Sequence, residues 1–384
     1  MLDHFSFKRA HLAKAYCDSV AGKGIANATS GLFLAGPRRV GKSTFLIEDL
    51  MPEVKARRWL PVYVDLWANK LIDPAILITE TIKTAIASYK SRLSKLARKV
   101  KVQKINILKT VELDFSKPGL PDNVTLVDAL TQLIKLAEKP VVLIIDEAQH
   151  ALTTQNGINT MFSIKSARDQ INMLNNAPDL MLVLTGSNRD KLAQLVVKKD
   201  QPFFGSEITA FPLLGQDFTD PFTKEVNKAL AKNNQFTKES VWEAFQLIGY
   251  RPEILRQMIG RVAINHDAQS FSDLLKQDAS LWHTQIWEEF ENDFNRLSAL
   301  QRVILTLLIK QGRAWSPFSE ESMGYYQEAI HQPTLSVSTV QTAIQALREQ
   351  GFIWQSSRGA YALEDDSFAE WFMYNSKPIN QKNK

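Results

Sequence analysis

Short apolar runs that stop abruptly at polar residues mark the first half of the chain. The runs GLFLAG (31–36), VVLII (141–145) and LMLVL (180–184) have the length and branched apolar content of buried central strands in a parallel sheet. The stretch STFLIEDLM (43–51) follows the first of them and has helical character. Strands that alternate with helices predict an α/β fold, with a parallel sheet and helices on both faces.

The pattern changes after residue 215. Residues 216–290 carry helical periodicity and no strand pattern, which predicts a helical domain. From residue 297, two amphipathic helical segments precede IWQSSRGAYAL, whose apolar-alternating arms around SSRG predict a hairpin. Two helices followed by a hairpin predict a winged helix over 291–375, with a terminal helix at 368–375. The tail, 376–384, is expected to be disordered.

The octapeptide GPRRVGKS (36–43) matches the phosphate-binding P-loop pattern G-x-x-x-x-G-K-[ST]. It lies between a predicted strand and a predicted helix, as a P-loop requires. Gly36 and Gly41 permit the turn and the close approach of the backbone to phosphate. Lys42 is expected to reach the outer phosphates of ATP, and the Ser43 hydroxyl to hold Mg²⁺. The expected nucleotide-binding residues in this loop are Gly36, Pro37, Arg38, Arg39, Val40, Gly41, Lys42, Ser43 and Thr44.

Two carboxylates follow the apolar run VVLII directly. Ligands of open α/β sheets bind at the carboxyl ends of the strands, so this placement points to the nucleotide site. Asp146 is the predicted second Mg²⁺ contact, and Glu147 is the predicted general base for a water that attacks the γ-phosphate. The alternative is that the acidic pair caps a following helix.

The run LMLVL is followed by TGSN (185–188), where a polar side chain is expected to orient the attacking water. Ser187 and Asn188 are equal candidates, and the alternative is an ordinary turn. Further along, GYRPEIL (249–255) predicts a helix start, and Arg251 with Pro252 is a candidate phosphate contact. An ordinary connection between two helices explains the same letters.

Composition limits the class of protein. The 384 residues, 45% of them hydrophobic, suffice for two or three folded domains. Cys17 is the only cysteine, so no internal disulfide or cysteine-based metal site is expected, which suits a reducing cytoplasm. The apolar runs are too short to span a bilayer, and the N-terminus has no secretory signal pattern. The net charge of +5 is compatible with an anionic partner.

Positive charge is concentrated in a predicted helix-rich insertion, residues 73–138. No acidic residue occurs from Ile82 to Val111, while nine lysines and arginines from Lys83 to Lys109 do. Such a stretch binds phosphate backbones or acidic partners, or is simply a solvated helix face. The residues expected to contact duplex DNA, together with the winged helix, are Lys95, Arg98, Lys99 and Lys101.

Taken together, these segments resemble AAA+-related P-loop ATPases, in the prokaryotic branch near the STAND and Orc1/Cdc6 groups. The matching segments also include PVYVDLW (61–67) and FFGSEITAFPLL (203–214), and they span about residues 30–260. The resemblance implies an ATPase domain (1–215), a helical lid (216–290) and a winged helix (291–375). It also implies ATP and Mg²⁺ as ligands, with Lys42, Ser43, Asp146 and Glu147 in their motif roles.

Two positions depart from the pattern of that branch. Many relatives carry Gly-Arg where this chain has Gly205 and Ser206, so the usual arginine finger is missing. Arg251 also lies one place early relative to the Orc-like arginine. The leading hypothesis is an Mg²⁺-dependent ATPase that drives a conformational switch in a DNA-associated, mobile-element or defence process. The alternative is a nucleotide-gated DNA-binding or scaffold module with negligible hydrolysis, with a protein partner or self-association.

Overall fold

The structure is a computed structural model, which describes residues 5–23, 27–100, 118–121, 124–173, 177–264 and 270–376. Its contacts divide the chain into two compact units. The sheet unit comprises residues 8–36 and 42–211, and the helical unit comprises residues 1–7, 37–41 and 212–384.

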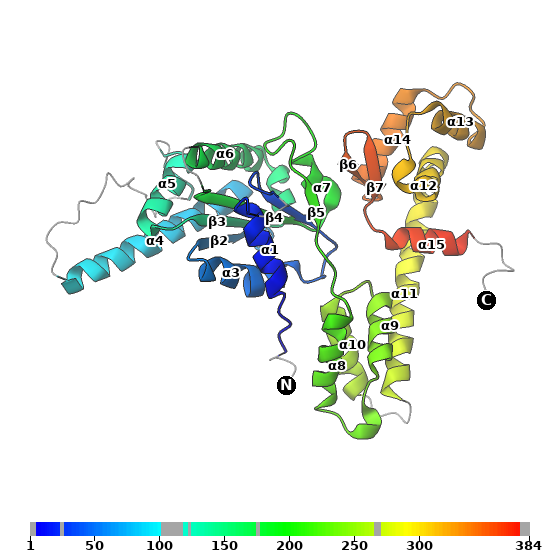
Figure 1. The fold of residues 1–384 in the computed structure, drawn as a ribbon. Helices are drawn as coiled ribbons and strands as arrows, with labels where there is room; N and C mark the ends of the chain where they lie inside the picture. The colour runs from blue at the N-terminus through cyan, green and yellow to red at the C-terminus, as the bar shows by residue number, and fades with distance from the viewer. Residues whose placement is uncertain are drawn as a thin grey trace. The chain divides into compact units, whose positions relative to one another are not determined.

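A five-stranded, all-parallel sheet forms the centre of the sheet unit (Figure 1). The strand order is β2-β3-β4-β1-β5. The strands are β1 (Leu32–Ala35), β2 (Leu60–Asp65), β3 (Val141–Asp146), β4 (Leu180–Gly186) and β5 (Ile208–Ala210). Strands β1, β3 and β4 are buried throughout, which confirms the central strands predicted from the apolar runs.

Helices cover both faces of this sheet, as the sequence predicted. Val141, Leu143 and Ile145 point to one face and pack in a core with helices α4 (Pro74–Val100), α5 (Leu126–Ala137) and α6 (Gln155–Asn172). The opposite face is covered by α1 (Ala10–Val20) and by the helix that follows the P-loop (Figure 1). The fold is therefore α/β, and successive side chains of a strand point to opposite faces of the sheet.

The helix after the P-loop is continuous but irregular. It begins as α2 (Lys42–Phe45), widens into a π-helical turn, η2 (Leu46–Leu50), and ends as α3 (Met51–Ala56). Pro52 explains the wide turn, because it has no N–H for the carbonyl of Glu48. That carbonyl accepts a hydrogen bond from Lys8 Nζ at 3.0 Å instead.

Part of the expected insertion belongs to the core. Ile78, Ile82 and Ile86 of α4 are fully buried against the sheet, so the first half of this helix is integral to the sheet unit. Lys83, the first residue of the basic stretch, is also fully buried, and its ammonium lies 2.8 Å from Glu80 Oε1. Lys83 therefore does not belong to an exposed basic face, which corrects the sequence interpretation at that position.

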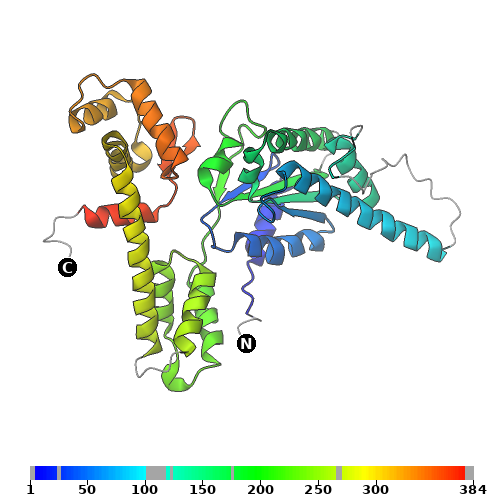
Figure 2. The same cartoon turned by 180° about the vertical axis from the view of Figure 1, so that it is seen from behind.

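The helical unit begins with a bundle (Figure 2). Phe218, Phe222 and Phe245 anchor its core. Its elements are α8 (Gln216–Asn227), η4 (Lys232–Asn234), α9 (Lys238–Leu247), α10 (Pro252–Ile264) and α11 (Phe271–Arg296). The boundary expected at residues 290 and 291 falls inside α11, whose C-terminal half packs on the next core through Trp287, Phe290 and Phe294.

The C-terminal part of the helical unit is a set of helices followed by an antiparallel hairpin. The elements are α12 (Ala299–Gln311), η5 (Gly312–Ala314), α13 (Glu320–Ala329), α14 (Val337–Glu349), β6 (Ile353–Ser357), β7 (Ala360–Leu363) and α15 (Ser367–Asn375). The order is the one expected of a winged helix. The predicted tail, apart from Ser376, lies outside the described residues. In the described part of the chain, no helix combines the length and the apolar character needed to cross a bilayer.

Candidate nucleotide site

The P-loop connects β1 to α2 with the backbone that its glycines allow. Arg39 and Gly41 have φ angles of 67° and 90°, in the left-handed region. At Gly36, a Cβ would lie only 3.1 Å from Phe211 Cβ, so a larger residue would disturb the packing of the loop. The Gly36 N–H also donates to the carbonyl of Gly186 at 3.2 Å, which joins the ends of β1 and β4.

The polar side chains of the loop suit a nucleotide phosphate. Lys42 is 5% exposed, and its Nζ donates to the Gly36 carbonyl at 2.8 Å. A buried ammonium held at the mouth of a P-loop is a point charge placed for phosphate. Ser43 and Thr44, in the first turn of α2, are exposed, as are Arg38 and Arg39, whereas Val40 is buried, with 1% of its surface exposed.

Asp146, the last residue of β3, is buried, with only 1% of its surface exposed, and is held by hydroxyl groups. Tyr63 Oη donates to its Oδ2 at 3.0 Å, and Thr185 Oγ1 donates to its Oδ1. The backbone N–H of Glu147 also donates to Oδ1, at 3.1 Å. The two hydroxyl bonds come from β2 and β4, the two neighbours of β3, and together with the Glu147 N–H they fix the carboxylate at the carboxyl edge of the sheet.

Asp146 and Ser43 fit a magnesium ion that is shared with substrate phosphates. No group of three or more His, Cys, Asp or Glu side chains forms a metal site within the described ranges. Mg²⁺ commonly takes one carboxylate and several waters or phosphate oxygens, so a complete protein cage is not required. Asp146 and Ser43 are the side chains available for that role.

Glu147 lies next to Ser187, which follows β4. Ser187 Oγ donates to Glu147 Oε2 at 2.6 Å, and Ser187 N–H donates to the same oxygen at 3.3 Å. Gln149 Nε2 also donates to Oε2 and lies 3.4 Å from Ser187 Oγ. Within the described part of the chain, all hydrogen bonds to this carboxylate therefore converge on one oxygen. The backbone of Glu147 has φ of 54°, a conformation that costs a non-glycine residue roughly 1–3 kcal/mol.

Gln149 is one of two residues near this carboxylate edge that the sequence analysis did not single out. It lies in the 3₁₀ turn η3 (Ala148–Thr153) and is 4% exposed. Its Oε1 has no hydrogen-bond partner among the described residues, which costs about 1–3 kcal/mol in a buried position. Gly186 makes room for it, because a Cβ there would lie 2.9 Å from Gln149 Oε1. Gln149 therefore lies against the Glu147 carboxylate, with which it shares a hydrogen bond.

The two candidates in TGSN have different surroundings. Ser187 contacts Glu147, whereas the Asn188 side chain accepts the Lys191 N–H at 2.7 Å and caps α7 (Arg189–Gln194). The geometry therefore favours Ser187 as the polar residue beside Glu147. Tyr63 was also missed. Its signal was its position two residues before Asp65, which is aligned with Asp146 in the register of β2 and β3.

Negative charge accumulates at the carboxyl edge of the sheet. Burial raises the pKa of Asp65, and the carboxylates of Asp146 and Glu147 raise it further. Burial, followed by the charge and hydrogen bond of Asp146, likewise raises the pKa of Tyr63. The edge thus favours cations or protonated groups.

Arg251 and Pro252 lie in the helical unit, where Pro252 is the first residue of α10. The Arg251 carbonyl accepts the Leu255 N–H at 3.1 Å, as expected at a helix start. Their role as phosphate contacts stays a prediction.

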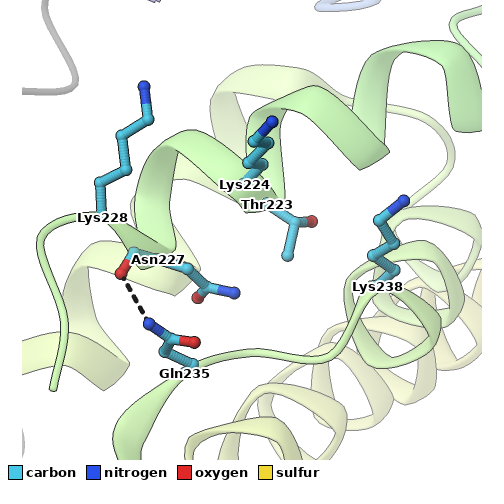
Figure 3. A pocket seen from close by; sticks show the side chains of 6 residues that line it. All are labelled: Thr223, Lys224, Asn227, Lys228, Gln235 and Lys238. Atoms are coloured by element: carbon cyan, nitrogen blue, oxygen red, sulfur yellow. Dashed lines mark hydrogen bonds between the residues drawn. The ribbon is translucent and has the colours of Figure 1, made fainter. Parts of the chain in front are cut away.

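A hollow in the helical unit is a separate feature (Figure 3). Lys224, Lys228 and Lys238 surround it, and two of them pair with acids, Lys228 with Glu225 and Lys238 with Asp220. Its amides bond within the protein; Gln235 Nε2, for example, donates to the Asn227 carbonyl. The hollow therefore offers no counterpart to the carboxylate, hydroxyl and P-loop groups of the nucleotide site.

Comparison with known proteins supports the fold. No family model and no curated protein matches the chain. A Walker-type ATPase of Pyrococcus abyssi matches with 19% identity over 97% of this chain and 100% of that one, with a TM-score of 0.53. The ORC2 protein of Aeropyrum pernix in its ADP form matches with 12% identity over 95% and 93%, with a TM-score of 0.54. At these identities the similarity shows the fold alone: the chain shares the fold of these two proteins.

Proposed function

We propose that this protein binds Mg²⁺-ATP and hydrolyses it to ADP and phosphate. The observation that carries the proposal is the pairing at the sheet edge. Asp146 is fixed by hydroxyl groups, and Glu147 stands beside it with one carboxylate oxygen fully engaged. A P-loop with a buried lysine starts from a neighbouring part of the same edge, at the end of β1.

The chemistry assigns one task to each group. The P-loop N–H groups and Lys42 bind the phosphates and stabilise charge that develops on them. Mg²⁺, when bound, neutralises charge on the phosphate oxygens, with Ser43 and Asp146 as its protein contacts. Glu147 accepts a proton from the water whose oxygen forms the new bond to the γ-phosphorus. The bond from that phosphorus to the ADP oxygen breaks, and the electron pair leaves with ADP.

The two similar structures support nucleotide use, since one is a Walker-type ATPase and the other an ADP form. Ser206, in place of an arginine, favours slow intrinsic turnover. The same absence of an arginine at position 206 is the support for the alternative function, nucleotide-gated binding with negligible hydrolysis.

Phosphate release by the full chain separates these functions. We expect turnover with ATP and Mg²⁺ that is lost in EDTA and in Lys42→Ala, but retained in Lys55→Ala, an exposed lysine of α3. If Lys42→Ala released phosphate as fast as the wild type, the assignment of the P-loop as the ATP site would be wrong. ATP binding without any phosphate release would instead establish the gated binding module.

We further propose that ATP turnover switches a DNA-bound state in the cytoplasm. The support is the distal part of α4, which is rich in lysine and arginine and contains no acidic residue. Phosphate contacts of this kind release counterions, so binding should be sequence-tolerant and should weaken steeply with salt. The substitutions that test it are Lys95→Gln, Arg98→Gln, Lys99→Gln and Lys101→Gln, of which the last lies outside the described residues.

Fluorescence anisotropy with duplex DNA is the assay. The fourfold variant should bind several-fold more weakly, with a flatter salt dependence, while deletion of 297–384 should matter less for affinity. Absence of any binding at low salt, with or without ATP, would make the basic stretch and the winged helix surfaces for a protein partner or for self-association.

A further inference from the structure

Gln149 stands two residues after Glu147 yet folds back onto it. The left-handed backbone at Glu147 ends β3 and turns the chain into η3, and this turn brings the two side chains together. Gln149 Nε2 donates to Glu147 Oε2, and Ser187 Oγ donates to the same oxygen at 2.6 Å. Because Nε2 also lies 3.4 Å from Ser187 Oγ, the three side chains form a closed triangle.

The triangle constrains one end of the carboxylate. The Ser187 N–H adds a third bond to Oε2, at 3.3 Å, so this oxygen has its acceptor positions occupied. A carboxylate fixed through one oxygen presents the other in a defined direction. Oε1 is then the oxygen left to accept the proton of a water molecule.

The amide of Gln149 is directed at the Glu147 carboxylate. Its Nε2 donates to Glu147 Oε2 and lies 3.4 Å from Ser187 Oγ, while its Oε1 has no partner among the described residues. The position is also built for this side chain, since Gly186 leaves the space that its amide occupies.

We propose that Gln149 is a positioning residue for the catalytic base: with Ser187 it holds Oε2 of Glu147, and thereby aims Oε1 at the attacking water. The inference rests on the proposed ATP hydrolysis and adds a group that does not touch the substrate. It predicts that Gln149 affects kcat and leaves the binding of ATP alone.

The first test is Gln149→Met, which keeps the length of the side chain and removes the donor. We expect kcat to fall at least about tenfold, in line with the loss of alignment of a general base, and KM for ATP to stay within about twofold. The matched control is Gln132→Met on α5, because Gln132 is buried and neither of its amide atoms has a hydrogen bond among the described residues. This control should retain the wild-type kcat.

The second test is the pH profile of Gln149→Glu. A carboxylate in contact with Glu147 forms a like-charged pair, which raises the apparent pKa of the pair and moves the acid limb of kcat to higher pH. The other titratable groups around this edge are Asp65 and Tyr63 on β2, Asp146 on β3 and His150 on η3, and they are unchanged in the variant.

The outcomes are distinct. A normal kcat in Gln149→Met, or an acid limb that does not move in Gln149→Glu, would overturn the positioning role while wild-type hydrolysis stands. An equal fall of kcat in Gln132→Met would show that loss of packing explains the effect. If the wild type releases no phosphate, the proposed function fails, and the positioning role fails with it.

Discussion

Thr185→Val tests whether the buried network around Asp146 is as tight as the geometry indicates. Thr185 is fully buried, and its hydroxyl donates to Asp146 Oδ1. Valine has nearly the same shape, so the change removes the hydroxyl without opening a cavity. Asp146 keeps its bonds from Tyr63 and from the Glu147 N–H.

The magnitude follows from the kind of bond that is lost. A hydrogen bond to a charged, buried group contributes about 1.5–3 kcal/mol, so we expect a loss of about 2 kcal/mol. A free-energy change of about 1.4 kcal/mol alters an equilibrium constant tenfold. A loss of about 2 kcal/mol therefore makes hydrogen exchange roughly thirtyfold faster at those backbone amides that become exposed when the network opens.

Hydrogen exchange measures this loss of local stability in the full chain, when mass spectrometry follows the peptides that contain β3 and β4. Thr79→Val is the matched control, because Thr79 is also buried but bonds only the carbonyls of its own helix, and its loss should change exchange little. A change below about threefold in Thr185→Val would mean that the hydroxyl does not hold Asp146, and the reasoning would fail.

Two further variants test the charges at the same edge. Glu147→Gln retains an oxygen that can accept the bonds from Ser187 and Gln149, so ATP should still bind while phosphate release slows at least about a hundredfold; unchanged turnover would place the base elsewhere. Asp65→Asn should stabilise the protein at neutral pH. The raised pKa of Asp65 means that the folded state holds its proton more tightly, so wild-type stability falls as pH rises from the ordinary value of 3.8 through the raised one. Thermal unfolding across this range should show a smaller decline in Asp65→Asn, and identical curves would contradict the assigned pKa shift.

The sheet and the place of the P-loop motif between β1 and α2 were predictable for physical reasons. Central parallel strands are buried on both faces and so appear as apolar runs, as in β3 and β4. A P-loop needs its glycines and lysine at fixed spacing, so Gly36, Gly41 and Lys42 identify it in the absence of any coordinates.

The features that could not be predicted from the sequence depend on three-dimensional contacts and on backbone conformation. Tyr63 meets Asp146 across a separation of 83 residues, and only the strand register brings them together. Gln149 depends on the left-handed turn at Glu147, a conformation that the letters DEAQ do not encode locally. Lys83 looks like a surface charge by type, but its place among Ile82 and Ile86 on α4 puts it in the core.

Isothermal titration calorimetry of ATP with Mg²⁺ tests the central claim, that the P-loop is a nucleotide site, most directly. The wild-type chain should bind ATP, and binding should be abolished or strongly weakened in Lys42→Ala, because the ammonium that lies at the mouth of the loop is gone. Lys55→Ala should bind like the wild type. Equal affinity of the wild type and Lys42→Ala for ATP would contradict the account.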